Sequence, residues 1–357
     1  MKVVISGYYG FNNIGDEAIL KSIITSLKKE KADIEITVLS NNPSHTEKTY
    51  KVKSINRWNL TNIYKEIKNS DGLISGGGSL LQDVTSSRSI IYYTSIMGLA
   101  NLAKKPIFIY AQGVGPINKK INQSITRYFL NKVDYISLRD EDSANLVKKI
   151  GVKTKLEIVP DPVMGLDFKN IYVKDEENYI VVSVRDWNTK HDYLKEIASF
   201  CENISRLGIK IKLLPMHGKL DEEISLKLAS MIKNNVEILS YTMDIENKLK
   251  YIKGAKLVVA MRLHALIFAG NIGTPMIGVS YDPKIESYLK LVDQPCIGNV
   301  NDEIDSAKLT KEALYIIDNY IDIKRDLEKS TDSLKITAKL TATKALDIFK
   351  NYNREGK

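Results

Sequence analysis

The feature that most constrains this chain is the alternation of short apolar runs with longer amphipathic segments. Near-continuous apolar runs separated by segments of helical period are typical of a parallel sheet that helices cover on both faces. The predicted strands of the first half are residues 2–6, 34–39, 72–75, 106–111, 135–138 and 156–159. The clearest helical segments between them are residues 16–29, 89–103 and 122–132. This half therefore predicts a doubly wound α/β lobe.

The same alternation restarts after a polar, charged stretch at residues 167–178 and predicts a second α/β lobe. The predicted strands of this lobe are residues 179–184, 210–214, 236–239, 256–260 and 275–279. A length of 357 residues is sufficient for two domains. We predict two Rossmann-like doubly wound lobes, over residues 1–168 and 177–306, with a linker near 165–178. Residues 307–357 form a helical tail, and its packing across the first lobe is left open.

Composition and charge exclude several classes of protein. The chain is 43% hydrophobic and 27% charged, as globular proteins are, and no apolar run reaches the roughly eighteen residues of a membrane span. We expect no signal peptide. The only two cysteines, Cys201 and Cys296, lack the spacing of metal ligands and are too few for a disulfide-rich protein, which favours the cytoplasm. A net charge of +9 suits anionic partners, and a lysine-rich proteome is the alternative explanation. The lysines are spread over expected helices without an aromatic-basic motif, so we predict no nucleic-acid partner.

Ligands of doubly wound sheets bind outside the carboxyl ends of the strands, so the residues after each predicted strand are the candidates. After the first strand, Gly10, Asn13 and Gly15 belong to a loop that permits tight turns and close approach to a ligand. Asp16 stands where the helix is expected to begin. It either caps that helix or offers a carboxylate that accepts a proton from a hydroxyl. The loop matches neither a dinucleotide fingerprint nor a P-loop.

Two further glycine-rich segments follow the third and fourth strands. Gly76, Gly77 and Gly78 precede Ser79, and such a run exposes successive N–H groups that suit an anion or a sugar beside a helix start. A simple tight turn is the alternative. Gln112 follows the fourth predicted strand. Both segments are predicted to contact the ligand.

Arg139 directly follows the strand at residues 135–138, and its rigid guanidinium fork suits a carboxylate or a phosphate. The alternative is an ion pair with Asp140 or Asp142. Residues 140–142 also spell the Asp-x-Asp pattern of metal-dependent glycosyltransferases. Acidic residues in the first turn of a helix more often complement the helix dipole, so we predict no metal and no cofactor.

In the second lobe, Arg262 and His264 follow the strand at residues 256–260. An arginine can hold an anion while a histidine donates a proton, although a lone core histidine is the alternative. The two side chains share a face only if the chain there is extended. His217 follows another strand and is a second candidate, and Tyr281 adds polar lining after a third. His45 and His191 are expected in polar loops.

Together these segments resemble the polysaccharide pyruvyl transferases, and most closely their CsaB-like branch. The segments that carry the resemblance are residues 7–17, 76–80, 112–116, 137–140, 160–162, 262–265 and 278–284. The resemblance reaches to about residue 290 and implies two lobes arranged as in glycosyltransferase-B folds. It implies binding of phosphoenolpyruvate by Arg139, Arg262, Leu263 and His264, with Asp16 as an essential acidic position.

The reaction that the resemblance implies moves pyruvate from phosphoenolpyruvate onto two hydroxyls of one sugar, as a cyclic ketal, with release of phosphate. For the CsaB-like branch, the ketal is expected at O4 and O6 of N-acetylmannosamine in a lipid-linked disaccharide, a cell-wall precursor whose ketal anchors S-layer proteins. His264 is the expected general acid, Asp16 the general base, and Arg139 a further catalytic residue. Peripheral contact with the inner face of the membrane is left open.

Two rival functions are weighed against this one. A glycosyltransferase of the same build would use a nucleotide-sugar donor, but the second lobe lacks an identifiable set of ribose- and base-binding residues. A non-catalytic glycan- or lipid-binding module is disfavoured because Asp, Arg and His side chains gather at strand ends. The phosphoenolpyruvate-dependent enzyme is therefore the favoured prediction.

Overall fold

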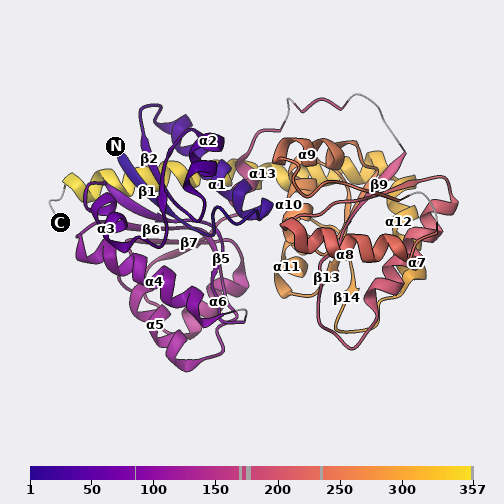
Figure 1. Cartoon of the computed structure of the whole chain (residues 1–357), viewed down its shortest axis with the longest axis horizontal. Helices are drawn as coiled ribbons and strands as arrows, with labels where there is room; N and C mark the ends of the chain where they lie inside the picture. The colour runs from indigo at the N-terminus through magenta and orange to yellow at the C-terminus, as the bar shows by residue number, and fades with distance from the viewer. Residues whose placement is uncertain (85, 169–170, 174–177, 234–235, 355–357) are drawn as a thin grey trace. The chain divides into compact units, whose positions relative to one another are not determined.

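The computed structural model of the chain describes residues 1–84, 86–168, 171–173, 178–233 and 236–354 and divides into two compact units (Figure 1). Unit 1 comprises Met1–Leu166 together with Leu334–Lys357, and unit 2 comprises Asp167–Ser333. Parts of the predicted linker, at 169–170 and 174–177, lie outside the described residues. Each unit contains its own parallel sheet, which confirms the predicted pair of doubly wound α/β lobes.

The sheet of unit 1 is parallel throughout and has the order β3-β2-β1-β4-β6-β7-β8, with β5 paired to β6 beyond the end of β4. Its strands are β1 (Lys2–Ser6), β2 (Glu35–Ser40), β3 (Lys53–Asn56), β4 (Gly72–Ser75), β5 (Gly78–Leu81), β6 (Ile107–Val114), β7 (Tyr135–Leu138) and β8 (Leu156–Ile158). The central strands are buried on both faces, which explains their unbroken apolar sequences. β3 and β5 were not predicted, because one is mostly polar and the other begins in the glycine run.

Helices cover both faces of this sheet. They are α1 (Ile14–Glu30), α2 (Pro43–Tyr50), α3 (Leu60–Lys68), α4 (Ser87–Leu102), α5 (Lys120–Leu130), α6 (Glu141–Lys149) and the short 3₁₀ helix η1 (Pro162–Gly165). Apolar residues of α3, α4, α5 and α6 form one continuous core with the strands. Gly72 of β4 leaves space for the ring of Phe349, so the chain's last helix also packs on this sheet.

The sheet of unit 2 is also parallel and has the order β11-β10-β9-β12-β13-β14. Its strands are β9 (Tyr179–Ser183), β10 (Lys210–Leu213), β11 (Val236–Ile238), β12 (Leu257–Ala260), β13 (Met276–Ser280) and β14 (Cys296–Asn299). Its helices are α7 (Tyr193–Arg206), α8 (Gly218–Ser230), α9 (Ile245–Gly254), α10 (Leu263–Ile272), α11 (Pro283–Leu291) and α12 (Ser306–Asp318). β14 was not predicted, because Gly298 and Asn299 interrupt its apolar pattern.

The last helix, α13 (Tyr320–Arg354), belongs to both units. Its first part buries Leu327 within unit 2. From Leu334 onward it belongs to unit 1, where Ala338 packs against Gly165. The chain therefore returns to its first unit at its end, and the boundary falls inside a helix. None of the helices, over the described residues, is long and apolar enough to cross a membrane.

Candidate functional site

Each sheet has one point at which the strand order reverses, and loops diverge there to leave room for a ligand. In unit 1 this point lies between β1 and β4, because β2 continues on one side and β6 on the other. In unit 2 it lies between β9 and β12. The residues that follow these four strands, together with those after their neighbours, are therefore the candidates in each unit.

The loop after β1 places Asp16 at this edge of unit 1. Helix α1 is capped by Asn13, whose side chain accepts a hydrogen bond from Gly15 N at 3.1 Å. Asp16 therefore lies in the first turn and is not the cap that the sequence suggested as one of its roles. Gly10 has φ +80°, and its N–H donates to Glu17 Oε1 at 2.8 Å. The predicted loop residues thus shape the helix start, where the dipole favours the carboxylate of Asp16.

The glycine run after β4 has a different role from the one its sequence suggested. Helix α4 begins only at Ser87, so the run does not stand at a helix start. A Cβ on Gly76 would lie 2.1 Å from the hydroxyl of Tyr9, and one on Gly78 would lie 2.6 Å from Asp16 Oδ1. Gly78 also has φ +92°, which other residues rarely adopt. The glycines therefore admit side chains from the β1 loop, while Gly77 packs closely on α1.

Arg139, at the end of β7, is the centre of a polar cluster in unit 1. Its side chain is buried, and its Nη2 donates to Ser79 Oγ at 2.8 Å. Its guanidinium also lies 3.4 Å from Asp140 and 3.5 Å from Asp161. The ion pair with Asp140 was one of the alternatives, and the sequence reasoning gave no role to Asp161. The cluster brings two predicted residues, Ser79 and Arg139, into direct contact.

Gln112 lies inside a strand and not after one. β6 runs to Val114 with a register irregularity, and Ala111 has φ +46°. The Gln112 side chain is fully buried, and neither its oxygen nor its nitrogen has a hydrogen-bond partner among the described residues. Such an amide normally finds a partner, so this buried polar group is available to a bound molecule or water. The next residue, Gly113, leaves room for Arg139, because a Cβ there would lie 2.8 Å from its Nη2.

Arg262 is held in unit 2 by a carboxylate that the sequence reasoning missed. Its Nε donates to Asp221 Oδ2 at 2.9 Å, and its Nη2 forms an ion pair with the other oxygen. Asp221 is fully buried and also accepts from the backbone N–H groups of Met216 and His217, at 3.1 and 2.9 Å. This bidentate contact with the buried Asp221 fixes the orientation of the guanidinium. Asp221 lies within α8, where no sequence pattern distinguishes it from a surface acid.

A second cation, Arg185, follows β9 in the same unit. Its guanidinium lies 4.3 Å from the ring centroid of Tyr281 and 5.0 Å from that of Trp187. The strand-end rule points to Arg185, since it follows a predicted strand, but the sequence analysis did not single it out. Lys284, at the start of α11, lies 5.4 Å from the ring of Tyr281 and is paired with Asp282 at 2.9 Å. Tyr281, which was predicted to line the site, therefore lies beside the positive charges of Arg185 and Lys284.

The histidines differ in their surroundings. Helix α10 begins at Leu263, with Arg262 as its N-cap, so His264 lies in the first turn and the side chain of Leu263 is buried. His217 is the N-cap residue of α8, and burial together with the charge of Arg262 lowers its pKa. A histidine with a lowered pKa is mostly neutral at pH 7. His45, expected in a loop, lies instead in α2.

Neither edge offers an obvious place for a metal. Over the described residues, no group of three or more His, Cys, Asp or Glu side chains is placed to hold an ion. Asp140 caps α6 through a bond from Ser143 N at 2.7 Å, which is the role expected of an acid at a helix start. The side chains that the structure places at the two edges are arginines, carboxylates and histidines.

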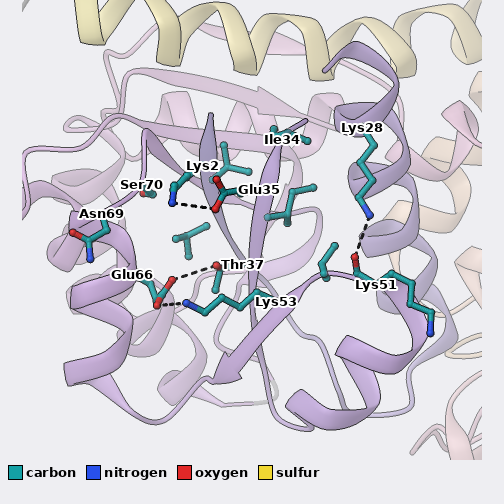
Figure 2. Close-up of a pocket in the computed structure, with 14 residues that line it drawn as sticks. Lys2, Lys28, Ile34, Glu35, Thr37, Lys51, Lys53, Glu66, Asn69 and Ser70 are labelled. Atoms are coloured by element: carbon teal, nitrogen blue, oxygen red, sulfur yellow. Dashed lines mark hydrogen bonds and ion pairs between the residues drawn. The ribbon is translucent and has the colours of Figure 1, made fainter. Parts of the chain in front are cut away.

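Figure 2 shows a pocket of about 390 Å³ that lies away from these residues, at the amino ends of β1, β2 and β3. Lys2 and Lys53, which line it, form ion pairs with Glu35 and Glu66 at 3.0 and 2.5 Å. These carboxylates balance the charge of two of the four lysines that line the pocket. Because ligands of doubly wound sheets bind at the opposite ends of the strands, this pocket is not the candidate site.

Comparison with known sequences identifies the family of this chain. The family model described as polysaccharide pyruvyl transferase matches residues 13–283, which include both edges. The chain belongs to the polysaccharide pyruvyl transferase family. This pyruvyl transferase is also similar to the amylovoran biosynthesis protein AmsJ of Erwinia amylovora, with 22% identity over 98% of this chain and 100% of that protein.

Solved structures similar to this pyruvyl transferase share its two-lobed fold. HepE of Anabaena, in complex with UDP-glucose, has a TM-score of 0.68 and 10% identity, over 97% of this chain and 99% of that one. The UDP-GlcNAc 2-epimerase of Neisseria meningitidis, bound to UDP-GlcNAc, has a TM-score of 0.64 and 11% identity, over 98% and 100%. These proteins confirm the glycosyltransferase-B-like fold, and identities this low show the fold alone.

Proposed function

We propose that this enzyme transfers the pyruvate of phosphoenolpyruvate to two hydroxyls of one sugar in a glycan, forming a cyclic ketal and releasing phosphate. The observation that carries the proposal is the rigid placement of Arg262 by the buried Asp221, beside the first-turn His264. Phosphoenolpyruvate bears a carboxylate and a phosphate, and such an arginine suits either group. Arg185 supplies a further cation at the same edge of unit 2.

The proposed chemistry begins with protonation of the donor. His264 donates a proton to the methylene carbon of phosphoenolpyruvate, which becomes a methyl group and leaves C2 electron-deficient. One sugar hydroxyl adds to C2, the C2–O bond to phosphate breaks, and a second hydroxyl completes the ketal. Two hydroxyl protons are released: one replaces the proton given by His264, and the other leaves with phosphate. Arg262 and Arg185 stabilise the charge of the departing phosphate.

Asp16 and Arg139 have the complementary tasks in unit 1. Asp16 accepts the proton of an attacking hydroxyl. It lies in the first turn of α1, where the helix dipole favours a carboxylate, and the missing side chain of Gly78 leaves room beside its Oδ1. Arg139 is buried between two carboxylates, which keeps its fork oriented toward Ser79. We assign Arg139 to the donor's carboxylate or phosphate, and the glycine-lined loops, with Gln112 and His217, to the sugars.

The acceptor that we propose is N-acetylmannosamine of a lipid-linked disaccharide, with the ketal at O4 and O6, as in the CsaB-like branch. Such an acceptor places the enzyme in the cytoplasm, against the inner face of the membrane, during synthesis of a wall polymer that anchors S-layer proteins. The segments that resemble this branch support the assignment. No cofactor or metal enters the proposed reaction.

A nucleotide-sugar glycosyltransferase is the second candidate, because similar folds have been solved with UDP-glucose and UDP-GlcNAc. Thermal unfolding with added ligands separates the two functions, since a ligand that binds the folded state raises Tm. We expect millimolar phosphoenolpyruvate to raise Tm and uridine nucleotides to leave it unchanged. Incubation with phosphoenolpyruvate and a panel of lipid-linked disaccharides, with phosphate release and product mass measured, then identifies the acceptor. Stabilisation by UDP alone, without phosphate release, would overturn the proposal.

A further inference from the structure

A buried arginine in unit 1 carries an aromatic platform that the proposed chemistry does not use. Arg57, which follows β3, is only 3% exposed. Its guanidinium lies 4.2 Å from the ring centroid of Tyr92, 5.1 Å from that of Phe11 and 5.2 Å from that of Trp58. Tyr93 is a fourth neighbour, at 5.6 Å. No carboxylate among the described residues pairs with Arg57, so aromatic faces and backbone oxygen stabilise this cation.

The platform is rigid. Arg57 Nη1 donates to Gly7 O at 3.0 Å, and the hydroxyl of Tyr92 donates to Arg57 O at 3.0 Å. The indole Nε1 of Trp58 donates to Asn41 Oδ1 at 3.2 Å, which fixes the plane of a ring that is 60% exposed. A single exposed apolar side chain on a protein surface is ordinary. An exposed indole that is held by a hydrogen bond and by a buried cation has already lost the rotational freedom that binding would cost.

The position of the platform ties it to the proposed acceptor. Phe11 lies in the loop between β1 and α1, the same loop that leads to Asp16, and it stacks on Tyr8 at 4.2 Å and 8°. Tyr8 therefore contacts a ring of the platform, since Phe11 is itself a neighbour of Arg57. Burial and the nearby charge of Asp16 raise the pKa of Tyr8, and the charge of Arg57 opposes this rise. The platform therefore adjoins the carboxyl edge of the sheet at its switch point.

We propose that Trp58, supported by Arg57 and Tyr92, stacks against a sugar ring of the acceptor glycan next to the sugar that receives pyruvate. One face of a pyranose consists of C–H groups, which pack on the negative face of an aromatic ring. Exposed amide groups such as Asn41 stand beside the indole, where they can bond to sugar hydroxyls. This inference deepens the proposed function and rests on it for the identity of the glycan.

The test measures glycan binding without a donor, so that it does not depend on the reaction. Fluorescently labelled wild-type protein is applied to an array of bacterial mono-, di- and oligosaccharides, beside Trp58→Ala, Trp58→Phe and Leu60→Ala. Leu60 is the matched control, because it is 51% exposed two residues away. We expect wild type and Leu60→Ala to bind the same oligosaccharides, and Trp58→Ala to bind them about tenfold more weakly, as loss of one stacked ring implies. Trp58→Phe keeps a ring and should retain most of the affinity.

Several outcomes would overturn the inference. They are equal binding by Trp58→Ala, preference for monosaccharides, and absence of binding by the wild-type protein. Loss of binding to vesicles of anionic phospholipid in both Trp58→Ala and Leu60→Ala, without a change on the array, would assign Trp58 to a membrane surface and also overturn the inference. Phosphate release from phosphoenolpyruvate is assayed separately. If it is absent while Trp58-dependent glycan binding persists, the proposed reaction fails and the sugar platform stands.

Discussion

Asp221 and Arg262 form a bidentate pair in which the carboxylate is fully buried and the guanidinium reaches the edge of the unit 2 sheet. The same carboxylate accepts two backbone N–H groups at the start of α8. One acid therefore couples the position of the proposed donor-binding cation to the path of a neighbouring loop. This relationship gives Arg262 a fixed direction before any ligand arrives, which reduces the entropy lost on binding.

Replacing Asp221 with Asn should raise the KM for phosphoenolpyruvate about tenfold or more, because an amide oxygen neither balances the charge of Arg262 nor holds both of its nitrogens. Breaking a buried pair from one side costs about 3–5 kcal/mol, so Tm should fall as well. Kinetics are measured well below the new Tm. Asp305→Asn is the control, since it removes an exposed helix-capping carboxylate that accepts from Ala307 N. An unchanged KM in folded Asp221→Asn would show that the pair does not position Arg262.

Replacing His264 with Gln should lower kcat about 10²- to 10⁴-fold, the usual contribution of a positioned general acid, while phosphoenolpyruvate still raises Tm. Glutamine keeps a hydrogen-bonding group in the first turn of α10 but cannot deliver a proton. His45→Gln is the matched control, because His45 is exposed on α2. Near-normal turnover by His264→Gln, with donor binding intact, would remove the acid assignment.

The strand-end rule accounts for much of what the sequence could predict here. The central strands are buried on both faces, so their apolar runs stand out. Arg139 follows one such run directly, and Arg262 and His264 come shortly after another. Asp221 could not be found in this way. It lies in α8, a helix with ordinary surface acids nearby, and only the folded chain brings it to Arg262, 41 positions away in the sequence.

The glycines showed where the backbone leaves room for another group, but not which group fills that room. The run at Gly76, Gly77 and Gly78 suggested N–H groups directed at a ligand, whereas two of the three make room for Tyr9 and Asp16. Which side chain enters such a space depends on how the β1 loop folds back, and no local pattern records that. The aromatic platform around Arg57 was not predicted for the same reason, because its rings come from three separate segments.

Replacing Arg185 with Gln should weaken binding of phosphoenolpyruvate and leave the fold intact. Arg185 is partly exposed, and its side chain stacks on Tyr281 and Trp187 without a carboxylate partner among the described residues. Loss of one charge-assisted contact corresponds to about 1.5–3 kcal/mol, or roughly a 10- to 100-fold rise in Kd. Isothermal titration with phosphoenolpyruvate measures the change. Arg206→Gln, an exposed arginine on α7, is the control, and equal affinities for both variants would exclude Arg185 from the donor site.

Replacing Gly113 with Ala should displace Arg139. A Cβ there would lie 2.8 Å from Nη2 and 2.9 Å from Nε, so the guanidinium must move away from Ser79. Because these atoms are the end of a side chain, the backbone need not shift, and Tm should change little. A displacement of about 1 Å of a positioned group can lower kcat/KM about 10²-fold. Gly98→Ala, within α4 and 3.3 Å from the ring of Phe129, should keep full activity. Full activity in Gly113→Ala would mean that the position of Arg139 is not critical.

Replacing Lys248 with Met should change how stability depends on pH. Lys248 is fully buried, where its Nζ donates to Pro215 O at 2.7 Å and to Ser240 O at 3.2 Å, and burial lowers its pKa from 10.5 to about 8. Between pH 8 and 10.5 the unfolded chain therefore binds this proton more readily than the folded protein does. The free energy of unfolding of the wild type should rise with pH across that window, relative to Lys248→Met, by up to about 3 kcal/mol.

Urea unfolding of both proteins at pH 7, 8, 9 and 10 measures this difference. At pH 7 the lysine is charged in both the folded and unfolded states, so the comparison there isolates the two carbonyl groups that Met leaves without a donor. Lys253→Met is the control, because its amine is only partly buried and donates to Ile171 O at 2.6 Å. If the difference between wild type and Lys248→Met stays constant from pH 7 to 10, Lys248 keeps an ordinary pKa. Its role in holding the loop before α8, and through it Asp221 and Arg262, would then be purely one of hydrogen bonding.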